Sequence, residues 1–325
     1  LGLEGEPGQF TASIRQKPRF VDLDKCTSCG ECINVCPISI NDDYNEGLSQ
    51  RKAIYKQYPQ AIPGAFAIEK KGTAPCRATC PAHVSVQGYI ALIAQGKYSE
   101  ALALFKKDHP FPGVCGRVCH HPCEGECTRT DVDQSLAIMH LHRFLADEDM
   151  ASNQPYIPDQ KTQRDEKVAI IGAGPAGLTC AYFLAVEGYQ VTVFEKLPVL
   201  GGMLTVGIPS YRLPREIIEA EIQVIKDLGV KFKTGVEIGK DITIAQLRNE
   251  GFNAFFMGIG SHECKVLGIE GEDYEGVYPG VEFLREVNLG NRISLGDRVA
   301  VIGGGNVAMD SVRTALRTGS SQPFI

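Results

Sequence analysis

The chain has 325 residues, of which 43% are hydrophobic, and a formal net charge of −6 at pH 7. This composition is typical of a globular protein of two to three domains rather than a disordered or fibrous one. The acidic balance and the absence of a basic run argue against nucleic-acid binding. Because no apolar stretch has membrane-spanning length, we expect no membrane insertion.

The cysteines are concentrated in the N-terminal part of the chain. Ten of the 12 lie between Cys26 and Cys127, and only Cys180 and Cys264 lie beyond. An extracellular disulfide scaffold fits this poorly, because the C-terminal half has the pattern of a nucleotide-binding domain of the reducing cytosol. Clustered cysteines in a cytoplasmic enzyme are more often metal ligands, so we expect a cytoplasmic protein with metal sites.

Residues 1–71 are expected to form short strands around a first cysteine motif. A proline directly follows the last cysteine of this motif. Its cysteines are Cys26, Cys29, Cys32 and Cys36. Two-residue spacings let one loop wrap several irons, and Gly30 eases the bends of that loop. Zinc is the alternative, but this motif favours a [4Fe–4S] cluster. Whether Cys36 or a distant cysteine such as Cys76 completes the cluster stays open.

Residues 72–160 are expected to form a helical iron–sulfur domain that ends in a polar linker. Val86, Tyr89 and Ile93 share one face of its first predicted helix. The segment holds six further cysteines: Cys76, Cys80, Cys115, Cys119, Cys123 and Cys127. Three-residue gaps put successive thiols on one side of a turn or short helix, so several can hold one cluster. Buried free thiols and zinc are the alternatives.

Residues 161–296 carry a dinucleotide fingerprint in its expected context. A buried strand, Lys167–Ile171, leads into a glycine-rich turn and an apolar helix, and the next strand, Gln190–Phe194, ends at an acid. The glycines permit the turn, the approach of a pyrophosphate and close helix packing, while the acid would bond ribose hydroxyls. The predicted binding residues are Gly172, Gly174, Pro175, Ala176, Gly177, Glu195 and Lys196.

Residues 297–325 begin a second unit of the same kind. The strand Arg298–Ile302 precedes a G-x-G-x-x-A turn, and a helix follows through about Arg317. The predicted binding residues here are Gly303, Gly305, Asn306 and Ala308. We expect the chain to end before the second strand of this unit, whose end would select NADH or NADPH. Since the chain begins at Leu1 and stops at Ile325, we expect a fragment of a longer protein.

Two sequence stretches near the N-terminus, PRFVDLDKCTSCGECINVCP and RKAIYKQYPQAIP, resemble the ferredoxin region of heterodisulfide reductase. The resemblance covers about the first fifth of the chain. It implies that this segment passes electrons between a flavin and partner subunits.

A closer resemblance begins with PCRATCPAHVSVQGYIALIAQGKYSEAL and continues through PFPGVCGRVCHHPCEGEC and HLHRFLAD. These stretches resemble the N-terminal domain of the glutamate synthase small subunit. The resemblance implies one [4Fe–4S] cluster on Cys80, Cys119, Cys123 and Cys127. Two cysteines of the family's second cluster are missing, so a third cluster on Cys36, Cys76 and Cys115 stays open. The family's non-cysteine ligand falls near His142.

The stretches LGGML and GIPSYRLP resemble the flavin-contacting loop of the same family, which implies FAD at the first site. The residues carried over from these stretches are Gly201, Gly202, Met203 and Arg212. The same resemblance places Val236 at the family position that touches adenine, and Gly260 at the end of a stretch, FFMGIG, that resembles the strand returning to the flavin. GGGNVAMD is typical of the family's NAD(P)H-binding domain.

We therefore predict an α+β multidomain chain. It comprises a ferredoxin-like segment, an α-helical iron–sulfur domain, a Rossmann-type FAD domain and the start of an inserted NAD(P) domain. The expected cofactors are FAD, two [4Fe–4S] clusters with a third left open, and NAD(P)H, and electrons would pass to or from a redox partner in a larger complex. The alternatives are a thioredoxin-reductase-like disulfide reductase and a non-catalytic electron-relay subunit. The former needs a Cys-x-x-Cys pair, and none follows Cys180.

Overall fold

The computed structural model describes residues 2–13, 18–70, 72–152 and 154–325. They form two compact units, each described here by itself. The smaller unit comprises Leu1–Thr79 and Cys123–Leu136, and the larger comprises Cys80–Pro122 and Ala137–Ile325. Within the described ranges, no helix is long and apolar enough to cross a membrane.

The smaller unit is built from short antiparallel pairs of strands. These pairs are β1 (Gly2–Glu4) with β2 (Thr11–Ser13), β3 (Ser39–Asn41) with β4 (Gln50–Lys52), and β5 (Ile54–Tyr55) with β6 (Ala67–Ile68). Its short helices are α1 (Glu31–Val35), α2 (Pro75–Thr79), η1 (Asp43–Asn45) and η2 (Thr128–Asp131), and α6 (Pro122–Gly125) begins at its border. The short strands expected around the first cysteine motif are thus present.

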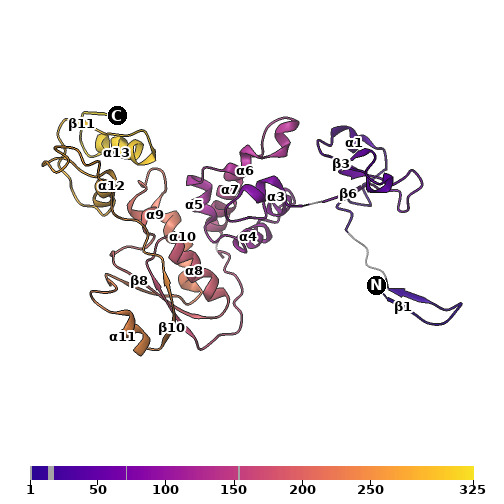
Figure 1. Cartoon of the computed structure of the whole chain (residues 1–325), viewed down its shortest axis with the longest axis horizontal. Coiled ribbons are helices and arrows are strands. Elements are labelled where there is room, and N and C mark those ends of the chain that lie inside the picture. The colour runs from indigo at the N-terminus through magenta and orange to yellow at the C-terminus, as the bar shows by residue number, and fades with distance from the viewer. Residues whose placement is uncertain (1, 14–17, 71, 153) are drawn as a thin grey trace. The chain divides into compact units, whose positions relative to one another are not determined.

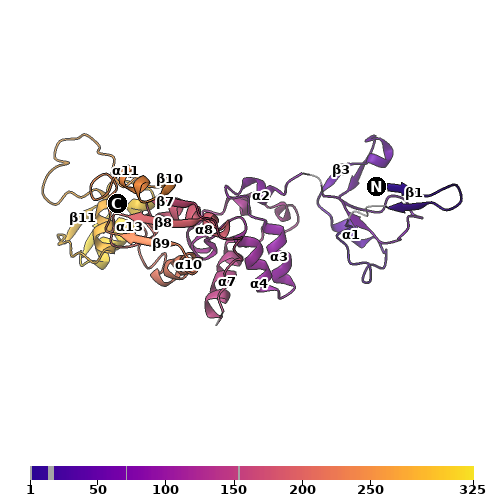
Figure 2. The same ribbon diagram turned by 90° about the horizontal axis from the view of Figure 1, so that it is seen from below.

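Four helices open the larger unit, and Figure 2 shows α3, α4 and α7 near one another. They are α3 (Val86–Ala94), α4 (Tyr98–Lys106), α5 (Pro112–Val118) and α7 (Ile138–Ala151). Their core is apolar and aromatic, with Tyr89, Phe105 and Leu145 all buried. Helix α5 lies very close to α7, because a Cβ added at Gly116 would stand 2.5 Å from the backbone nitrogen of Arg143.

A four-stranded parallel sheet in the order β10-β7-β8-β9 forms the centre of the dinucleotide domain (Figure 1). Its strands are β7 (Lys167–Ile171), β8 (Gln190–Glu195), β9 (Lys231–Thr234) and β10 (Phe252–Met257). Alternate residues of a strand point to opposite faces. Accordingly, Ile170 packs in the core with α8 (Pro175–Val186) and α10 (Arg215–Asp227), whereas Ala169 packs with Leu247 of α11 (Ile244–Asn249).

The last part of the chain contains a second parallel pair of strands, β11 (Arg298–Ala300) and β12 (Gln322–Phe324). Helix α13 (Asn306–Arg317) connects them, while α9 (Met203–Val206) and α12 (Gly280–Asn288) precede them. The expectation that the chain ends before the second strand of this unit is wrong. The strand is short and follows a Ser-Ser pair, so a pattern of alternating residues had too few positions to reveal it.

The predicted polar linker is held by hydrogen bonds to the ends of helices α8 and α10. Its first residues extend α7 to Ala151, and the Gln160 side-chain amide donates to the carbonyl oxygens of Ala185 and Leu228, both at 2.9 Å. The Lys161 N–H also donates to the Val186 carbonyl at 2.9 Å. These bonds satisfy carbonyls at the ends of α8 and α10, so the linker joins the C-terminal ends of the two helices.

Replacing Gly116 with alanine should destabilise the larger unit by about 1–3 kcal/mol, because the new methyl group has no room against α7. Chemical denaturation followed by circular dichroism measures the loss. Gly296→Ala is the matched control, since a Cβ there meets nothing within 4 Å. Equal stability of the two variants would contradict the close packing of α5 on α7.

Candidate iron–sulfur and dinucleotide sites

Three cysteines of the first motif surround one hollow in the smaller unit. The hollow has a volume of about 270 Å³, and Cys26, Cys29 and Cys32 line it together with Phe66. The loop turns sharply here because Ser28 and Gly30 have φ values of 62° and 88°, in the left-handed region. Three of the four predicted thiols thus face a common space.

Hydrogen bonds to a neighbouring segment hold this loop in place. The Ser28 hydroxyl donates to the Gly64 carbonyl at 2.6 Å, and the Lys56 ammonium donates to Ser28 Oγ at 3.3 Å. The Arg19 guanidinium donates to the Ala65 carbonyl at 2.6 Å. The shape of the cysteine loop therefore depends on residues near position 64, which the motif itself does not include.

The two remaining features of this loop concern its sulfurs. The backbone N–H of Glu31, followed by the Thr27 side chain, lowers the pKa of the Cys29 thiol, which favours the thiolate that iron requires. Cys36 is the C-cap of α1, and its Sγ lies 3.6 Å from the Ile38 carbonyl oxygen. It is absent from the lining of the hollow, so the open question of the fourth ligand stays open.

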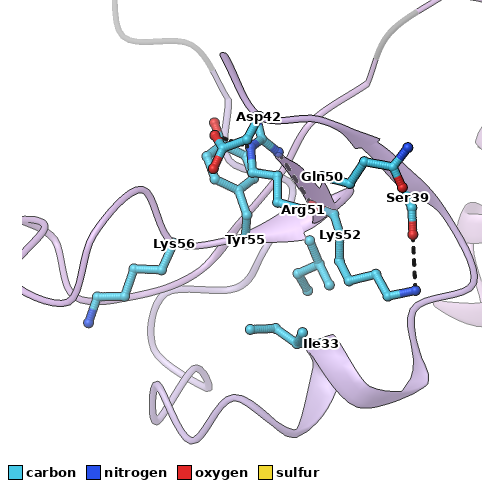
Figure 3. A pocket seen from close by; sticks show the side chains of 9 residues that line it. Ile33, Ser39, Asp42, Gln50, Arg51, Lys52, Tyr55 and Lys56 are labelled. Atoms are coloured by element: carbon cyan, nitrogen blue, oxygen red, sulfur yellow. Dashed lines mark hydrogen bonds and ion pairs between the residues drawn. The ribbon is translucent and has the colours of Figure 1, made fainter. Parts of the chain in front are cut away.

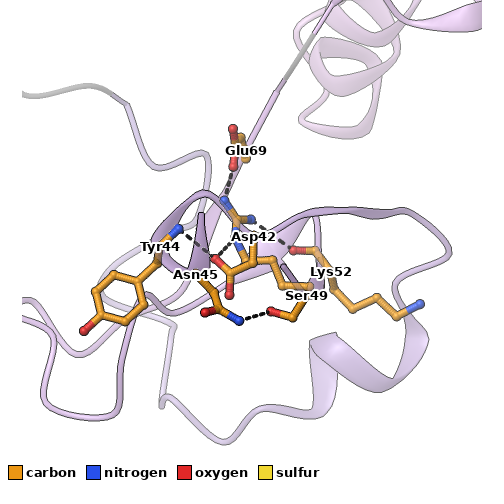
Figure 4. Close-up of polar contacts among 7 residues, drawn as sticks. Asp42, Tyr44, Asn45, Ser49, Lys52 and Glu69 are labelled. Carbon is orange, nitrogen blue, oxygen red and sulfur yellow. Dashed lines mark hydrogen bonds and ion pairs between the residues drawn. The ribbon is translucent and has the colours of Figure 1, made fainter. Parts of the chain in front are cut away.

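A second hollow of about 320 Å³ lies next to the first, and Ile54 lines both. Figure 3 shows that polar and basic side chains surround it, among them Lys52 and Lys56. Arg51 in its wall pairs with Asp42 and Glu69, and its guanidinium lies 3.6 Å from the centroid of the Tyr55 ring. Figure 4 shows the polar contacts around Asp42 and Glu69. This network joins the β3–β4 hairpin to Glu69.

The second group of cysteines is divided between the two units. Cys80, Cys115 and Cys119 lie in the larger unit. Cys76, Cys123 and Cys127 lie in the smaller one. The predicted ligand set of Cys80, Cys119, Cys123 and Cys127 therefore spans both units, and its convergence on one cluster stays a prediction.

A histidine that the sequence analysis did not single out contacts Cys115. His109 Nδ1 accepts the Phe111 N–H at 3.0 Å, so the neutral ring carries its proton on Nε2, which lies 3.5 Å from Cys115 Sγ. Burial lowers the pKa of His109 and, with the nearby Cys119, raises the pKa of Cys115 to about 12. No sequence pattern links these residues, because their contact depends on how the segment before α5 folds back.

His142 is buried on α7 between two aromatic rings. Its ring centroid lies 5.4 Å from that of Tyr89 and 4.7 Å from that of Phe105. Burial, and then the charge of His109, lowers its pKa to about 4. Within the described residues neither ring nitrogen has a hydrogen-bond partner. This histidine is held by packing, and a role as a cluster ligand remains untested.

In the described ranges, no three His, Cys, Asp or Glu side chains come close enough to hold a single metal ion. A four-iron cluster places a different requirement on its ligands, because each iron takes its own thiolate. The ligands therefore stand around a cube and do not meet at a point. The hollow beside Cys26, Cys29 and Cys32 is compatible with this second arrangement.

The first glycine turn has the tight geometry expected of a dinucleotide site. Gly172 has φ 101°, and a Cβ there would stand 2.4 Å from the Gly258 carbonyl oxygen. A Cβ at Gly177 would stand 1.9 Å from the Gly172 carbonyl oxygen. At Gly174, by contrast, the nearest atom is Gly202 Cα at 4.0 Å. Two glycines are thus required by the fold, while Gly174 leaves open space at the N-terminus of α8.

Glu195 is placed at this turn by backbone hydrogen bonds. One carboxylate oxygen accepts the Ala173 N–H at 2.7 Å, and the other accepts the Leu197 N–H at 2.9 Å. The N–H of Val236 donates to the Glu195 carbonyl at 3.0 Å, so this predicted adenine neighbour lies beside the acid. Each carboxylate oxygen keeps a free lone pair, and bonding to a ribose remains a prediction.

The remaining predicted residues of the first site lie on the loops around this turn. Gly201 and Gly202 have positive φ, and a Cβ at Gly202 would stand 2.8 Å from Gly174 Cα. The structure thus brings the LGGML stretch against the glycine turn, and Met203 begins α9 there. Lys196 is exposed. Gly260 follows β10 in a left-handed conformation, with φ 70°.

His262, another residue that the sequence analysis missed, lies beside this site. A Cβ at Gly260 would stand 3.7 Å from the His262 ring. Burial, followed by the charge of Lys196, lowers the pKa of His262, whereas the carboxylate of Glu195 opposes this change. Its position after β10, at the carboxyl end of a parallel strand, is a signal that sequence analysis had available.

The second glycine turn is linked to the first site by an ion pair. Gly303 has φ 124°, Gly305 is the N-cap of α13, Asn306 begins that helix, and Ala308 is buried. Arg212, predicted to contact flavin, pairs with Asp310 of α13 at 2.5 Å. The predicted flavin loop and the predicted nicotinamide domain are therefore joined through these two charges.

A buried carboxylate joins α10 to the cysteine-bearing helix α5. Glu221 accepts the N–H of Gly113 at 2.5 Å and the N–H of Val114 at 3.3 Å. Burial raises the pKa of Glu221 to about 8, against the opposing effects of these N–H groups and of Lys106 and Arg117. Helices α5 and α10 thus share a titratable contact.

Three family models match the chain. The 4Fe–4S binding domain matches residues 19–40. The model described as dihydropyrimidine dehydrogenase domain II, 4Fe–4S cluster, matches residues 49–154. Pyridine nucleotide-disulphide oxidoreductase matches residues 166–322. Along the chain, two iron–sulfur models thus precede a pyridine-nucleotide model, in the order that the sequence predicted.

Curated proteins are similar to the chain over most of its length. The chain is 46% identical over 257 residues to the NADPH-Fe(3+) oxidoreductase subunit beta of Geobacter sulfurreducens, covering 78% of this chain and 38% of the relative. It is 47% identical over 274 residues to the NADP(+)-dependent formate dehydrogenase subunit beta of Moorella thermoacetica, covering 77% and 39%.

The small chain of glutamate synthase from Escherichia coli is 36% identical over 264 residues, covering 77% of this chain and 55% of the relative. The predicted resemblance to the glutamate synthase small subunit is thereby confirmed, together with the 4Fe–4S and pyridine-nucleotide character of the chain. The chain spans only about two-fifths to half of the length of these relatives.

Two glycines of the turn should respond differently to the same substitution. Gly177→Ala should destabilise the domain by about 1–3 kcal/mol or more, because the methyl group meets the backbone. Gly174→Ala should leave the fold intact and weaken dinucleotide binding, because its methyl group fills the space that a phosphate needs. Thermal melting and equilibrium titration with FAD separate the two effects. Unchanged FAD affinity in the Gly174 variant would exclude this turn as the phosphate site.

Glu221 should make the folded state less stable as the pH rises. Because its folded pKa is raised to about 8 from 4.5, the folded state holds the proton more tightly than the unfolded chain. This stabilisation is complete below pH 4.5 and is lost as the pH rises through about 8. Glu221→Gln should remove the loss, since its amide oxygen still accepts the Gly113 N–H.

Melting temperatures of the wild type and the Glu221→Gln variant, compared from about pH 5 to about pH 9, measure this difference. The wild type should fall behind the variant only at the upper end of the range. Parallel curves would show that Glu221 does not titrate in this window.

Proposed function

We propose that this chain is the electron-transfer part of an FAD-dependent NAD(P)H oxidoreductase with [4Fe–4S] clusters. The observation that carries the proposal is a shared core. Phe111 and Val114 of the cysteine-bearing segment pack in one apolar cluster with Leu178, beside the glycine turn, and Ile217 of α10. A rigid connection of this kind suits electron transfer, which needs donor and acceptor at a fixed separation.

FAD is proposed to bind at the first glycine turn. Gly172, Gly174 and Gly177 would receive the pyrophosphate at the N-terminus of α8, where unpaired N–H groups favour negative charge. Glu195 would bond the ribose, and Val236 would lie near the adenine. The loops holding Pro175, Ala176, Lys196, Gly201, Gly202, Met203, Arg212 and Gly260 would complete the site.

NAD(P)H is proposed to bind at the second turn, where Gly303, Gly305, Asn306 and Ala308 begin α13. The pairing of Arg212 with Asp310 supports this arrangement, because it links the two predicted cofactor loops directly. Bound flavin would supply hydride chemistry, and bound clusters would supply one-electron transfer. The side chains of this chain would orient the cofactors, and none is needed as a nucleophile or general base.

The thiols are proposed to hold two [4Fe–4S] clusters. Cys26, Cys29 and Cys32 would bind the first, with either Cys36 or Cys76 as the fourth ligand. Cys80, Cys119, Cys123 and Cys127 would bind the second. Cys115 is left with Cys36 and Cys76 as a source of a possible third site. The proposed domains are residues 1–71, 72–160, 161–296 and 297–325.

A redox partner is proposed because similar proteins are themselves parts of assemblies. The Geobacter and Moorella relatives are both named as beta subunits. The same fact favours a second candidate, an electron-relay subunit whose flavin does not turn over NAD(P)H on its own. NAD(P)H-dependent dye reduction by the full-length protein separates the two, since only the first candidate reduces the dye.

The disulfide-reductase alternative is not favoured. The matching model carries disulphide oxidoreductase in its name, yet the printed sequence holds only Cys180 and Cys264 in the region that it matches. Their separation in sequence excludes a Cys-x-x-Cys pair in this part of the chain.

Single cysteine substitutions should remove clusters separately. Cys29→Ser should lower the iron and sulfide content by about one cluster, and Cys119→Ser should do the same with loss of a different EPR signal. Cys180→Ser is the matched control and should keep both signals. Iron and sulfide analysis with low-temperature EPR of anaerobically reduced protein makes the measurement. Zinc in place of iron, or loss of one and the same signal in both variants, would refute the two-cluster assignment.

A further inference from the structure

The N-terminus of α5 is capped by a side chain that is distant in sequence and lies in the same compact unit. A helix leaves its first N–H groups without intrahelical partners, and the residue at the N-cap usually supplies an acceptor. In α5 the N-cap is Phe111, which makes no side-chain cap. Glu221 of α10 supplies the acceptors instead, 108 positions along the chain from Gly113.

This contact leaves little freedom for α5 to move. A Cβ at Gly113 would stand 2.9 Å from Ile217 Cγ2 and 3.0 Å from Glu221 Oε1, so the helix backbone lies directly on α10. On its other side, a Cβ at Gly116 would stand 2.5 Å from Arg143 N, so the backbone of α5 lies even closer to α7. Helix α5 is therefore held between two helices, with a glycine at each contact.

The other charges around Glu221 are also fixed. Lys106 is only 4% exposed, and it donates to the Tyr156 carbonyl at 3.2 Å and pairs with Asp149 at 3.6 Å. Arg117 of α5 pairs with Asp147 at 2.6 Å. Both cations act on Glu221, yet their short contacts are with these aspartates. The main hydrogen bonds of the Glu221 carboxylate are thus those to α5.

The short helix carries thiols at its middle and end. Cys115 lies in its second turn, and Cys119 is its C-cap, with an N–H that donates to the Cys115 carbonyl at 3.2 Å. At a rise of about 1.5 Å per residue, Cys119 lies only about 9 Å along the axis from Gly113. A shift at the capped end therefore reaches the cysteines almost undiminished.

We propose that Glu221 is a positioning residue that fixes Cys115 and Cys119 relative to the dinucleotide domain, and thereby sets electron transfer between flavin and cluster. This inference rests on the proposed function. The simpler reading is that Glu221 only contributes to stability, as any cap does. The two readings differ in what happens to the cluster when the carboxyl group is removed from an otherwise folded protein.

The test uses full-length protein loaded anaerobically with clusters and flavin. Glu221→Leu removes both acceptors, whereas Glu221→Gln keeps an oxygen for the Gly113 N–H. Glu216→Gln is the control, because Glu216 lies on the same helix and is exposed. Stopped-flow absorbance measures flavin reduction by NADPH and cluster reduction separately, and EPR after dithionite records the spectrum and midpoint potential of the cluster.

In Glu221→Leu, cluster reduction should slow by about tenfold or more, because small displacements from a remote substitution have large kinetic effects. The EPR spectrum of the cluster should change, while flavin reduction stays within about twofold of the wild type. The Gln variant and the Glu216 control should both resemble the wild type. If the Gln and Leu variants melt at the same temperature and only Gln restores the rate and the spectrum, a purely stabilising role is ruled out.

The inference is overturned if Glu221→Leu keeps the wild-type spectrum and rate, or if Gln and Leu lose them equally. Failure of NADPH to reduce the clusters of the wild type would sink the proposed function instead, and the dithionite spectra would still decide the role of Glu221. Should the Leu variant not fold, Gly113→Ala strains the same contact from the side of α5 and is judged by the same spectra.

Discussion

The apolar core beneath the parallel sheet includes Phe111 and Val114, which lie outside residues 161–296, the predicted FAD domain. They pack among residues of β7, β8, α8 and α10, so this domain cannot complete its core alone. Burial of such side chains contributes about 1.5–3 kcal/mol each. The iron–sulfur helices are thus tied to the sheet by the same force that folds the sheet itself, and the orientation of α5 is a consequence of core packing.

Polar contacts fix the relative position of these helices more closely than the apolar contacts do. The Tyr182 hydroxyl of α8 donates to the Lys106 carbonyl at 3.2 Å, and Gln160 joins the ends of α8 and α10. Buried polar groups such as Lys106 and Glu221 seldom add stability over apolar side chains of equal size, because desolvation offsets their interactions. Their role here is geometric, because each can form its hydrogen bonds in only one register of the helices.

Local patterns predicted the elements whose residues repeat regularly. β7 matches the predicted strand at Lys167–Ile171, and α13 ends at Arg317 as expected, because apolar periodicity and glycine turns define both within a few residues. The sequence analysis missed His109, Glu221 and His262. The contacts of His109 and Glu221 depend on folding, and the partner of Glu221 is 108 positions away.

The cysteines also show what sequence patterns cannot predict. Spacing alone identified all ten candidates, yet their surroundings differ in ways that spacing does not contain. Cys29 is exposed, and N–H and hydroxyl donors lower the pKa of its thiol, whereas burial raises the pKa of Cys115 to about 12. Solvent exposure and hydrogen bonds to sulfur are among the factors that set cluster potentials. Spacing therefore identifies the candidate ligands, whereas the surroundings that would tune a cluster bound by them depend on the folded chain.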